Sequence, residues 1–250
     1  MRKFLLTDQD AVMRRRSRRS YKDLPVEGEK AEALKELIGK LNEESGLRIC
    51  FLEDGRSAFA GLSKSYGMFK GVRSLIVIFG RKADEDRREK CGYYGEKLVL
   101  EATKRRLGTC WVGGTFDRKN GLFQAGEEEE LICIITVGEV REELSFKENL
   151  LQGLIHRKSK SEKELCSFDE EPPEWFWQGM RLVAAAPSAK NSQKFRFHYF
   201  EGRVCADIAA DEYFDMVDLG IAKLHFEIGA GGRFEWGKGA AYRREEESLA

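Results

Sequence analysis

The feature that most restricts the fold of this chain is a repeat in the order of its own sequence segments. The stretch RRSRRSYKDL (15–24) has a counterpart, shorter by one residue, in RKSKSEKEL (157–165). Farther along, LIGKLNEESGLRICFLEDGR (37–56) matches LVAAAPSAKNSQKFRFHYFEGR (182–203), each with the pattern of helix, break, strand and Gly-Arg turn. Such a repeat favours folds in which two similar halves pack together.

A third match supports the same repeat. Gly95 and Trp111 are separated by the same interval as Gly220 and Trp236. Each match alone is weak, but three matches in the same order indicate an internal duplication. We therefore expect one chain to fold as a fused pseudo-dimer, equivalent to two subunits of a symmetric dimer.

Length and charge restrict the class of protein further. The chain has 250 residues, 42% of them hydrophobic, and can bury a sizeable core. We divide it into a first half, 1–150, and a shorter second half, 151–250, which together form one compact unit. The 43 Lys and Arg residues balance the 43 Asp and Glu residues, so no overall field favours nucleic acid or an anionic membrane. Any anion site must therefore be local.

Periodicity predicts an α+β fold. Apolar residues recur with helical spacing in 31–41, and a second helix is predicted over 93–108, closed by Gly108. The charged runs 81–90 and 125–131 are typical of solvated faces and loops. Strands are predicted in three apolar stretches, 47–56, 74–80 and 130–139.

Cysteine use and the start of the chain indicate the compartment. The six cysteines are scattered, with no CxxC pair and no His at metal-ligand spacing, so we expect reduced thiols and no metal site. The start has only a Phe-Leu-Leu stub where a secretory signal needs a longer apolar core. No apolar run approaches the ~20 residues of a membrane span. We expect a soluble cytoplasmic protein that does not act at a membrane.

The sharpest basic feature is the run RRRSRRSY at 14–21. Arg15, Arg16 and Arg19 surround Ser17. Guanidinium groups bind phosphate oxygens bidentately, and a nearby hydroxyl adds a short hydrogen bond, so the run predicts a phosphate clamp. A solvated basic helix face or a nucleic-acid patch remains the alternative.

A second segment, APSAKNSQ at 186–193, has the composition of a ligand-binding turn. Small side chains and the fixed φ of Pro187 give a ligand access to main-chain groups. Ser188 and Asn191 can hydrogen-bond to carbonyls and ring nitrogens of a heterocycle. The alternative is an ordinary helix-to-strand connection, in which Pro, Ser and Asn are common.

Together these segments resemble the FMN-dependent nitroreductase family. Arg15-Arg16-Ser17-x-Arg19-x-Tyr21 resembles its N-terminal Arg/Ser signature, and APSAKNSQ is similar to its Pro-Ser-Asn segment. LGTCWVGG (107–114) looks like the stretch that follows the family's long central helix. The internal duplication makes the single-chain branch, the putative TM nitroreductases, the most similar part of the family.

The resemblance implies a nitroreductase-like α+β fold and one flavin site. Family enzymes are dimers that bind FMN across the interface, with the Arg/Ser signature from one subunit and the Pro-Ser-Asn segment from the other. Here the first copy keeps the Arg/Ser signature and the second keeps the Pro-Ser-Asn segment, while RKSKSE and KLNEESG are degraded. We expect one tightly bound FMN per chain and a monomer that acts as a pseudo-dimer.

The resemblance also implies site residues. The FMN phosphate and ribityl side would be held by Arg15, Arg16, Ser17 and Arg19. The isoalloxazine would be lined by Pro187, Ser188, Ala189 and Asn191, and its reactive edge approached by the backbone of Gly113 and Gly114. The family's Gln-Pro-Trp is Gln193-Lys194-Phe195 here, so its Trp is replaced.

The implied activity is that of an FMN-dependent NAD(P)H oxidoreductase. NAD(P)H would donate hydride to the flavin N5, and a small-molecule acceptor such as a nitroaromatic or quinone would then take electrons in a ping-pong cycle. Such chemistry requires no catalytic side-chain nucleophile. The alternatives are an FMN-binding protein of this fold with lost or specialised activity, as a sensor or in flavin handling, and a nucleic-acid binder. The neutral charge and the lack of aromatics among residues 14–19 disfavour the nucleic-acid binder.

Overall fold

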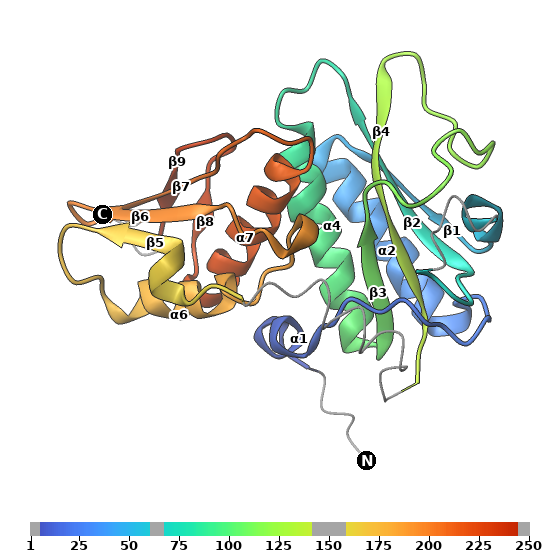
Figure 1. The fold of residues 1–250 in the computed structure, drawn as a ribbon, viewed down its shortest axis with the longest axis horizontal. Coiled ribbons are helices and arrows are strands. Elements are labelled where there is room, and N and C mark those ends of the chain that lie inside the picture. Colours follow the sequence, from blue (N-terminus) through green and yellow to red (C-terminus); the bar gives the residue numbers. More distant parts are fainter. Residues whose placement is uncertain (1–5, 61–67, 142–158, 245–250) are drawn as a thin grey trace.

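Two sheets lie on either side of a central pair of helices in the computed structural model, which describes residues 6–60, 68–141 and 159–244 (Figure 1). Helices α4 and α7 run side by side between the sheets. The boundary at residue 150 that divides the two halves in sequence lies outside the described residues.

The first half forms a four-stranded sheet in the order β1-β2-β4-β3, with every neighbouring pair antiparallel. Its elements are α1 (Asp8–Arg14), α2 (Gly28–Ser45), β1 (Arg48–Leu52), η1 (Arg56–Phe59), β2 (Ser74–Arg81), α4 (Arg87–Lys104), β3 (Leu107–Val112) and β4 (Glu129–Glu139). The predicted helix at 31–41 and the three predicted strands are confirmed.

The second half forms a five-stranded sheet in the order β5-β6-β7-β9-β8, in which β5 is parallel to β6 and the other pairs are antiparallel. Its elements are η2 (Glu162–Leu165), β5 (Cys166–Phe168), α6 (Glu174–Val183), η3 (Ala189–Asn191), β6 (Arg196–Phe200), β7 (Arg203–Asp207), α7 (Asp215–Ala230), β8 (Arg233–Phe234) and β9 (Ala240–Arg243).

The two halves share one topology. Each has the order helix, strand, strand, helix, strand, strand, as α2-β1-β2-α4-β3-β4 and as α6-β6-β7-α7-β8-β9. The strand orders β1-β2-β4-β3 and β6-β7-β9-β8 also correspond one to one. The repeat seen in the sequence is therefore present as a repeat of architecture, and β5 is an addition at the edge of the second sheet.

Burial on both faces explains why β2 is a continuous apolar run. Ile76 and Ile78 belong to the large core that surrounds the central helices. Their neighbours Leu75, Val77 and Phe79 point to the opposite face, where a smaller apolar cluster covers the sheet. A strand between two apolar layers needs no polar side chains at alternate positions.

Glycines allow α4 and α7 to cross in main-chain contact. A Cβ on Gly92 would lie 1.9 Å from the Val217 carbonyl oxygen, and a Cβ on Gly220 would lie 2.0 Å from the Glu89 carbonyl oxygen. Gly92 lies three residues after Glu89, and Gly220 lies three residues after Val217. The two contacts are therefore equivalent and are related by a local twofold axis. The residue equivalent to Gly220 is therefore Gly92, and the sequence match that paired Gly220 with Gly95 was out of register by three residues.

A buried ion pair accompanies the crossing. The Lys223 ammonium lies 2.5 Å from Glu89 Oε1, and both side chains are almost completely buried. Lys223 also donates to the carbonyls of Glu235 and Gly237, and Glu89 accepts the Gly237 N–H. The prediction that 81–90 is only a solvated stretch was wrong at its end, because α4 begins at Arg87 and carries Glu89 into the core.

The prediction that Gly108 closes the helix was also wrong. The helix α4 ends at Lys104, and Arg106 takes the left-handed conformation with φ of 60°. Gly108 lies in β3, where a Cβ would meet the side chains of Arg18 and Val140 at 3.0 and 2.4 Å. Close packing, and not a helix cap, therefore explains this glycine.

No helix in the described ranges combines the length and apolar composition needed to cross a bilayer.

Substitution of either crossing glycine should destabilise the protein. Gly92→Ala or Gly220→Ala places a methyl group against the backbone of the other helix, so each should lower the free energy of unfolding by about 2 kcal/mol or more. Thermal unfolding measures this loss, at about 2–4 °C per kcal/mol for a chain of this size.

Gly39→Ala is the matched control. Gly39 lies on the exposed face of α2 with nothing within 4 Å of a built Cβ, so this variant should be as stable as the wild type or more stable. Melting temperatures of the crossing variants equal to that of Gly39→Ala would contradict the close crossing.

Candidate functional site

Two adjoining cavities lie between the halves of the molecule. The first, here called the apolar cavity, has a volume of about 420 Å³, and the second, the basic cavity, has about 340 Å³. They share five lining residues, Ser17, Arg19, Pro187, Ser188 and Lys190. Residues from both halves form each cavity, so neither half alone could build the site.

All ten residues that the sequence predicted for the site line one cavity or both. Those in the apolar cavity are Ser17, Arg19, Gly113, Gly114, Pro187, Ser188 and Ala189. Those in the basic cavity are Arg15, Arg16, Ser17, Arg19, Pro187, Ser188 and Asn191. The structure thus brings together three segments that are about 75 to 170 residues apart in the chain.

Main-chain pairing with the first sheet fixes the basic segment. The Arg18 N–H donates to the Thr109 carbonyl at 2.8 Å, and the Lys22 N–H donates to the Glu139 carbonyl at 2.9 Å. In this extended chain, side chains alternate in direction. Arg18 is buried away from the cavities and donates to the Arg141 carbonyl, while Ser17 and Arg19 line the cavities. The run is therefore not an exposed helix face beyond Arg14.

Tyr21 anchors the same segment. Its hydroxyl lies 2.7 Å from the Arg18 carbonyl and 2.6 Å from the Thr136 hydroxyl, and its ring packs on Gly138. The aromatic position of the sequence signature is therefore buried and has a structural role, outside the described lining of either cavity.

Arg15 connects the basic cavity to a buried hydrogen-bond network. Its Nε lies 3.9 Å from Glu96 Oε1. Glu96 also accepts a hydrogen bond from Trp111 Nε1 at 2.8 Å and lies 3.1 Å from His225 Nε2. Burial lowers the pKa of the Arg15 guanidinium, while the charge of Glu96 acts in the opposite direction. A guanidinium in this position remains cationic because the ordinary arginine pKa is so high.

The turn 188–193 is held from inside by Gln193. Its side chain donates to the Ala184 carbonyl at 3.1 Å and accepts the Lys160 N–H at 2.8 Å. Its main-chain N–H donates to Ser188 Oγ at 3.0 Å. Lys190, Asn191 and Gln193 all have positive φ, between 43° and 55°. The turn therefore has a left-handed backbone conformation at three residues, held by part-buried hydrogen bonds, unlike a simple helix-to-strand connection.

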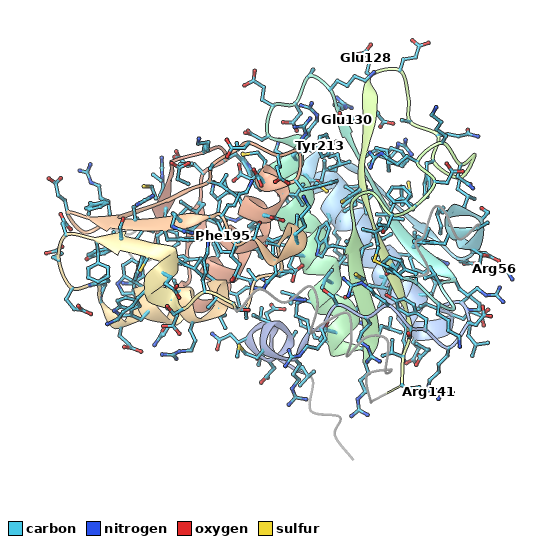
Figure 2. All side chains as sticks on the ribbon, viewed as in Figure 1. Arg56, Glu128, Glu130, Arg141, Phe195 and Tyr213 are labelled. Atoms are coloured by element: carbon cyan, nitrogen blue, oxygen red, sulfur yellow. The ribbon has the colours of Figure 1, made fainter. Side chains whose placement is uncertain are left out.

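The departure from the family pattern at Phe195 has a structural explanation. Phe195 is fully buried and lies in the large core at the entrance to β6, where Figure 2 labels it. It is not among the described residues that line either cavity. The aromatic residue at this position packs the second half and does not contribute a wall of the site.

Helix α7 contributes a wall that the sequence did not reveal. Phe214, Val217, Asp218 and Ile221 recur with helical spacing and line the apolar cavity. The ring of Phe214 lies on Gly113, where a Cβ would be only 2.5 Å from it. The segment 107–114 therefore needs a glycine at this position to accept the aromatic side chain from the other half.

An acid on that wall holds the ligand-binding turn. Both carboxyl oxygens of Asp218 accept the Ala189 N–H, at 3.1 and 2.9 Å, although Asp218 is only 3% exposed. Burial raises the pKa of Asp218 to about 8, the Ala189 hydrogen bond lowers it in part, and the charge of Asp215 raises it further. An acid at the start of a helix is so common that its sequence position gave no signal.

A third, more open hollow of about 480 Å³ adjoins the apolar cavity. Gly113 and Phe214 belong to both. Two of its other residues, Glu130 at the start of β4 and Tyr213 before α7, lie near one another in Figure 2. This hollow gives the apolar cavity a neighbouring space at which a second molecule could enter.

The two main cavities together suit a ligand with a flat apolar part and an anionic part. The flat apolar part would be surrounded by Trp111, Val112, Phe214 and Ile221. The anionic part would face three arginines of the basic cavity. Gly114 leaves open space where a side chain would stand, since no atom lies within 4 Å of a built Cβ. The residues present therefore fit a flavin mononucleotide.

No curated protein matches the chain. A crystal structure described as a putative nitroreductase from Thermotoga maritima superposes with a TM-score of 0.64 at 18% identity, over 97% of this chain and 94% of that one. At this identity, the likeness shows the fold.

Two further structures match only about half of this chain. A putative NADH oxidase from Clostridium acetobutylicum is 25% identical over 54% of this chain and 90% of that one, with a TM-score of 0.45. A putative nitroreductase in complex with FMN, from Desulfovibrio desulfuricans, is 19% identical over 58% of this chain and 96% of that one, with a TM-score of 0.44.

The match that identifies the family covers most of the chain. The family described as Putative TM nitroreductase matches residues 9–230. This range includes the Arg/Ser signature, the crossing helices and the turn 188–193. Fold, site and sequence agree, and the chain belongs to the Putative TM nitroreductase family.

Proposed function

We propose that the protein is an FMN-dependent NAD(P)H oxidoreductase that reduces a nitroaromatic, a quinone or a similar small acceptor. The observation that carries this proposal is a basic cavity joined to an apolar one, each built from both halves. A nucleotide phosphate suits the first and a planar heterocycle suits the second. Family membership supports the oxidoreductase class.

The chain's own residues would hold the cofactor in two ways. Arg15, Arg16, Ser17 and Arg19 would bind the phosphate and ribityl side, because guanidinium and hydroxyl groups donate to phosphate oxygens. The isoalloxazine would lie against the turn 188–191 and the wall of α7 in the apolar cavity. Its reactive edge would approach the backbone of Gly113 and Gly114.

The chemistry that FMN supplies when bound is hydride transfer at its N5, received from NAD(P)H and passed to the acceptor in a ping-pong cycle. The protein's part is to position the ring, exclude water and leave one side accessible. Apolar side chains on α7 and β3 exclude water from the apolar cavity, and the neighbouring open hollow leaves access for a second molecule. No described side chain needs to act as a nucleophile.

The local twofold axis supports one FMN per chain. It relates Val217 and Ile221 of the cavity wall to Glu89 and Tyr93 of α4. Glu89 is bound by Lys223, and the Tyr93 hydroxyl donates to Glu227 Oε2 at 2.5 Å while its ring packs on Trp236. Side chains thus fill much of the symmetric position, leaving a polar hollow of about 230 Å³.

The degraded turn of the first half supports the same stoichiometry. Where the second half breaks its helix at Ala184 and forms the turn 188–191, the first half continues α2 to Ser45 and ends it with Gly46 at φ of 69°. A continuous helix cannot present main-chain groups to a ligand. The halves 1–150 and 151–250 would therefore act as a pseudo-dimer within one monomer.

The visible spectrum of the purified protein tests the proposal. We expect a yellow protein that releases about one FMN per chain on heating, and steady oxidation of NAD(P)H when a nitroaromatic or quinone is added. A yellow protein without this oxidation would point to a sensor or a flavin-handling role. A colourless protein that fails to take up added FMN would refute the proposed function.

Arg19→Ala should weaken FMN binding. A lost charge-assisted hydrogen bond costs about 1.5–3 kcal/mol, so the dissociation constant for FMN should rise at least about tenfold. Quenching of flavin fluorescence on titration with protein measures this change. Binding of riboflavin, which has no phosphate, should change much less.

Arg14→Ala is the matched control, because Arg14 belongs to the same basic run but ends α1 and is not among the described residues that line the cavities. It should bind FMN as the wild type does. Equal losses in the two variants would mean that general charge, and not a phosphate site, is responsible.

A further inference from the structure

Asp218 is a buried acid without a direct ion pair among the described residues. It lies in the first turns of α7 and lines the apolar cavity, and its carboxyl oxygens accept the Ala189 N–H. The neighbouring acid Asp215 differs in this respect, because it pairs with Lys194 at 3.1 Å and accepts two main-chain N–H groups.

The hydrogen bond to Ala189 joins the two walls of the apolar cavity. Ala189 belongs to the turn 188–191, and Asp218 belongs to α7, so the bond sets the position of the turn relative to the helix. Gln193 holds the far side of the same turn. Without the Asp218 carboxyl group, the Ala189 end of the turn would lose its hydrogen bond to α7.

The charges around Asp218 are unequally placed. The negative charges of Asp215, on the same helix, and of Glu212, before it, both disfavour ionisation of Asp218. Lys194 favours it but is bound to Asp215 and lies 3.6 Å from Glu212. Two other cations line the cavity: Lys190, which pairs with Glu212 at 3.4 Å, and Arg19, which comes from the opposite half.

We propose that Asp218 is a positioning residue whose carboxyl group holds the turn 188–191 through the Ala189 N–H, and whose protonation couples the cavity's affinity for a flavin ring to pH. This inference rests on the proposed function. It assigns the acid no contact with reacting atoms. A purely structural role of Asp218 would leave flavin affinity independent of pH, whereas this role makes flavin affinity change with pH.

The sign of the pH effect follows from burial. A planar apolar ring in the cavity would displace water near Asp218, and loss of water disfavours the charged form of a carboxyl group. Above its pKa of about 8, Asp218 is ionised in the free protein. Binding of the flavin ring should therefore be accompanied by uptake of one proton by Asp218 at these pH values. Affinity should be constant below that pH and fall above it, up to about tenfold per pH unit.

Flavin titrations from pH 6.5 to 9.5 test the proposal. The wild-type dissociation constant for riboflavin and for FMN should rise above about pH 8. Asp218→Asn should remove this rise, because the amide does not titrate, while its oxygen still accepts the Ala189 N–H. Asp218→Ala should also lack the rise and should bind several-fold more weakly than Asp218→Asn at every pH, because the turn loses its attachment.

Glu212→Gln is the matched control. Glu212 is half-exposed, lies in the same acidic group and is not among the described residues that line the apolar cavity. Its dissociation constant should still rise with pH, with the onset at a somewhat lower pH, because loss of the Glu212 charge lowers the pKa of Asp218. If Asp218→Asn shows the same dependence as the wild type, the proposal is wrong.

Two measurements without flavin separate this inference from the proposed function. Because the pKa of Asp218 is raised on folding, its contribution favours the folded state at low pH and is lost as pH rises from about 4 to about 8. The difference in melting temperature, Asp218→Asn minus wild type, should therefore increase as the pH rises from about 4 to about 8. Hydrogen exchange in a peptide covering 188–193 should increase in Asp218→Ala and not in Asp218→Asn.

These results have distinct meanings. If the wild type binds no flavin but the exchange and melting results hold, the proposed function fails and the positioning role stands. If the wild type binds flavin but Asp218→Ala leaves the exchange of the turn unchanged, the positioning role fails and the proposed function stands.

Discussion

The main-chain contact between α4 and α7 is the constraint on which the rest of this structure depends. Each helix carries a glycine where the other presents a carbonyl oxygen, so the two helices lie closer than any side chain would allow. Both sheets pack against this pair, and each half supplies one of its helices. The halves are therefore joined through backbone, with the site at the edge of their contact.

Buried polar groups extend that contact to the site. Glu89 of α4 holds Lys223 of α7, and Glu96 connects Trp111 and His225 with Arg15 of the basic cavity. An unpaired charge in this position would be costly, so each acid has a partner from another element. The positions of Arg15 and Trp111 are thus determined together with the crossing of the helices.

Sequence patterns predicted three strands of the first sheet, the α+β class, the family and ten residues that line the cavities, because apolar runs and the Arg/Ser and Pro-Ser-Asn segments are local signals. They missed contacts made between distant segments. Glu89 looked solvated because its partner is 134 residues away. Asp218 looked like an ordinary acid of a helix start, and the equal Gly–Trp intervals pointed to Gly95, not Gly92, as the counterpart of Gly220. Phe214 became part of the site only through its packing on Gly113.

Joining the two halves in one chain has a consequence for how the site can change. In a symmetric homodimer one codon sets both copies of a residue, so an improvement at one interface position is imposed on its mirror position as well. Here Val217 and Glu89 occupy related places on the two crossing helices, yet they are separate codons under separate selection. One has become an apolar wall beside a cavity, and the other an acid that anchors a lysine. Such independence lets one of two related positions specialise for the site while the other is given over to stability.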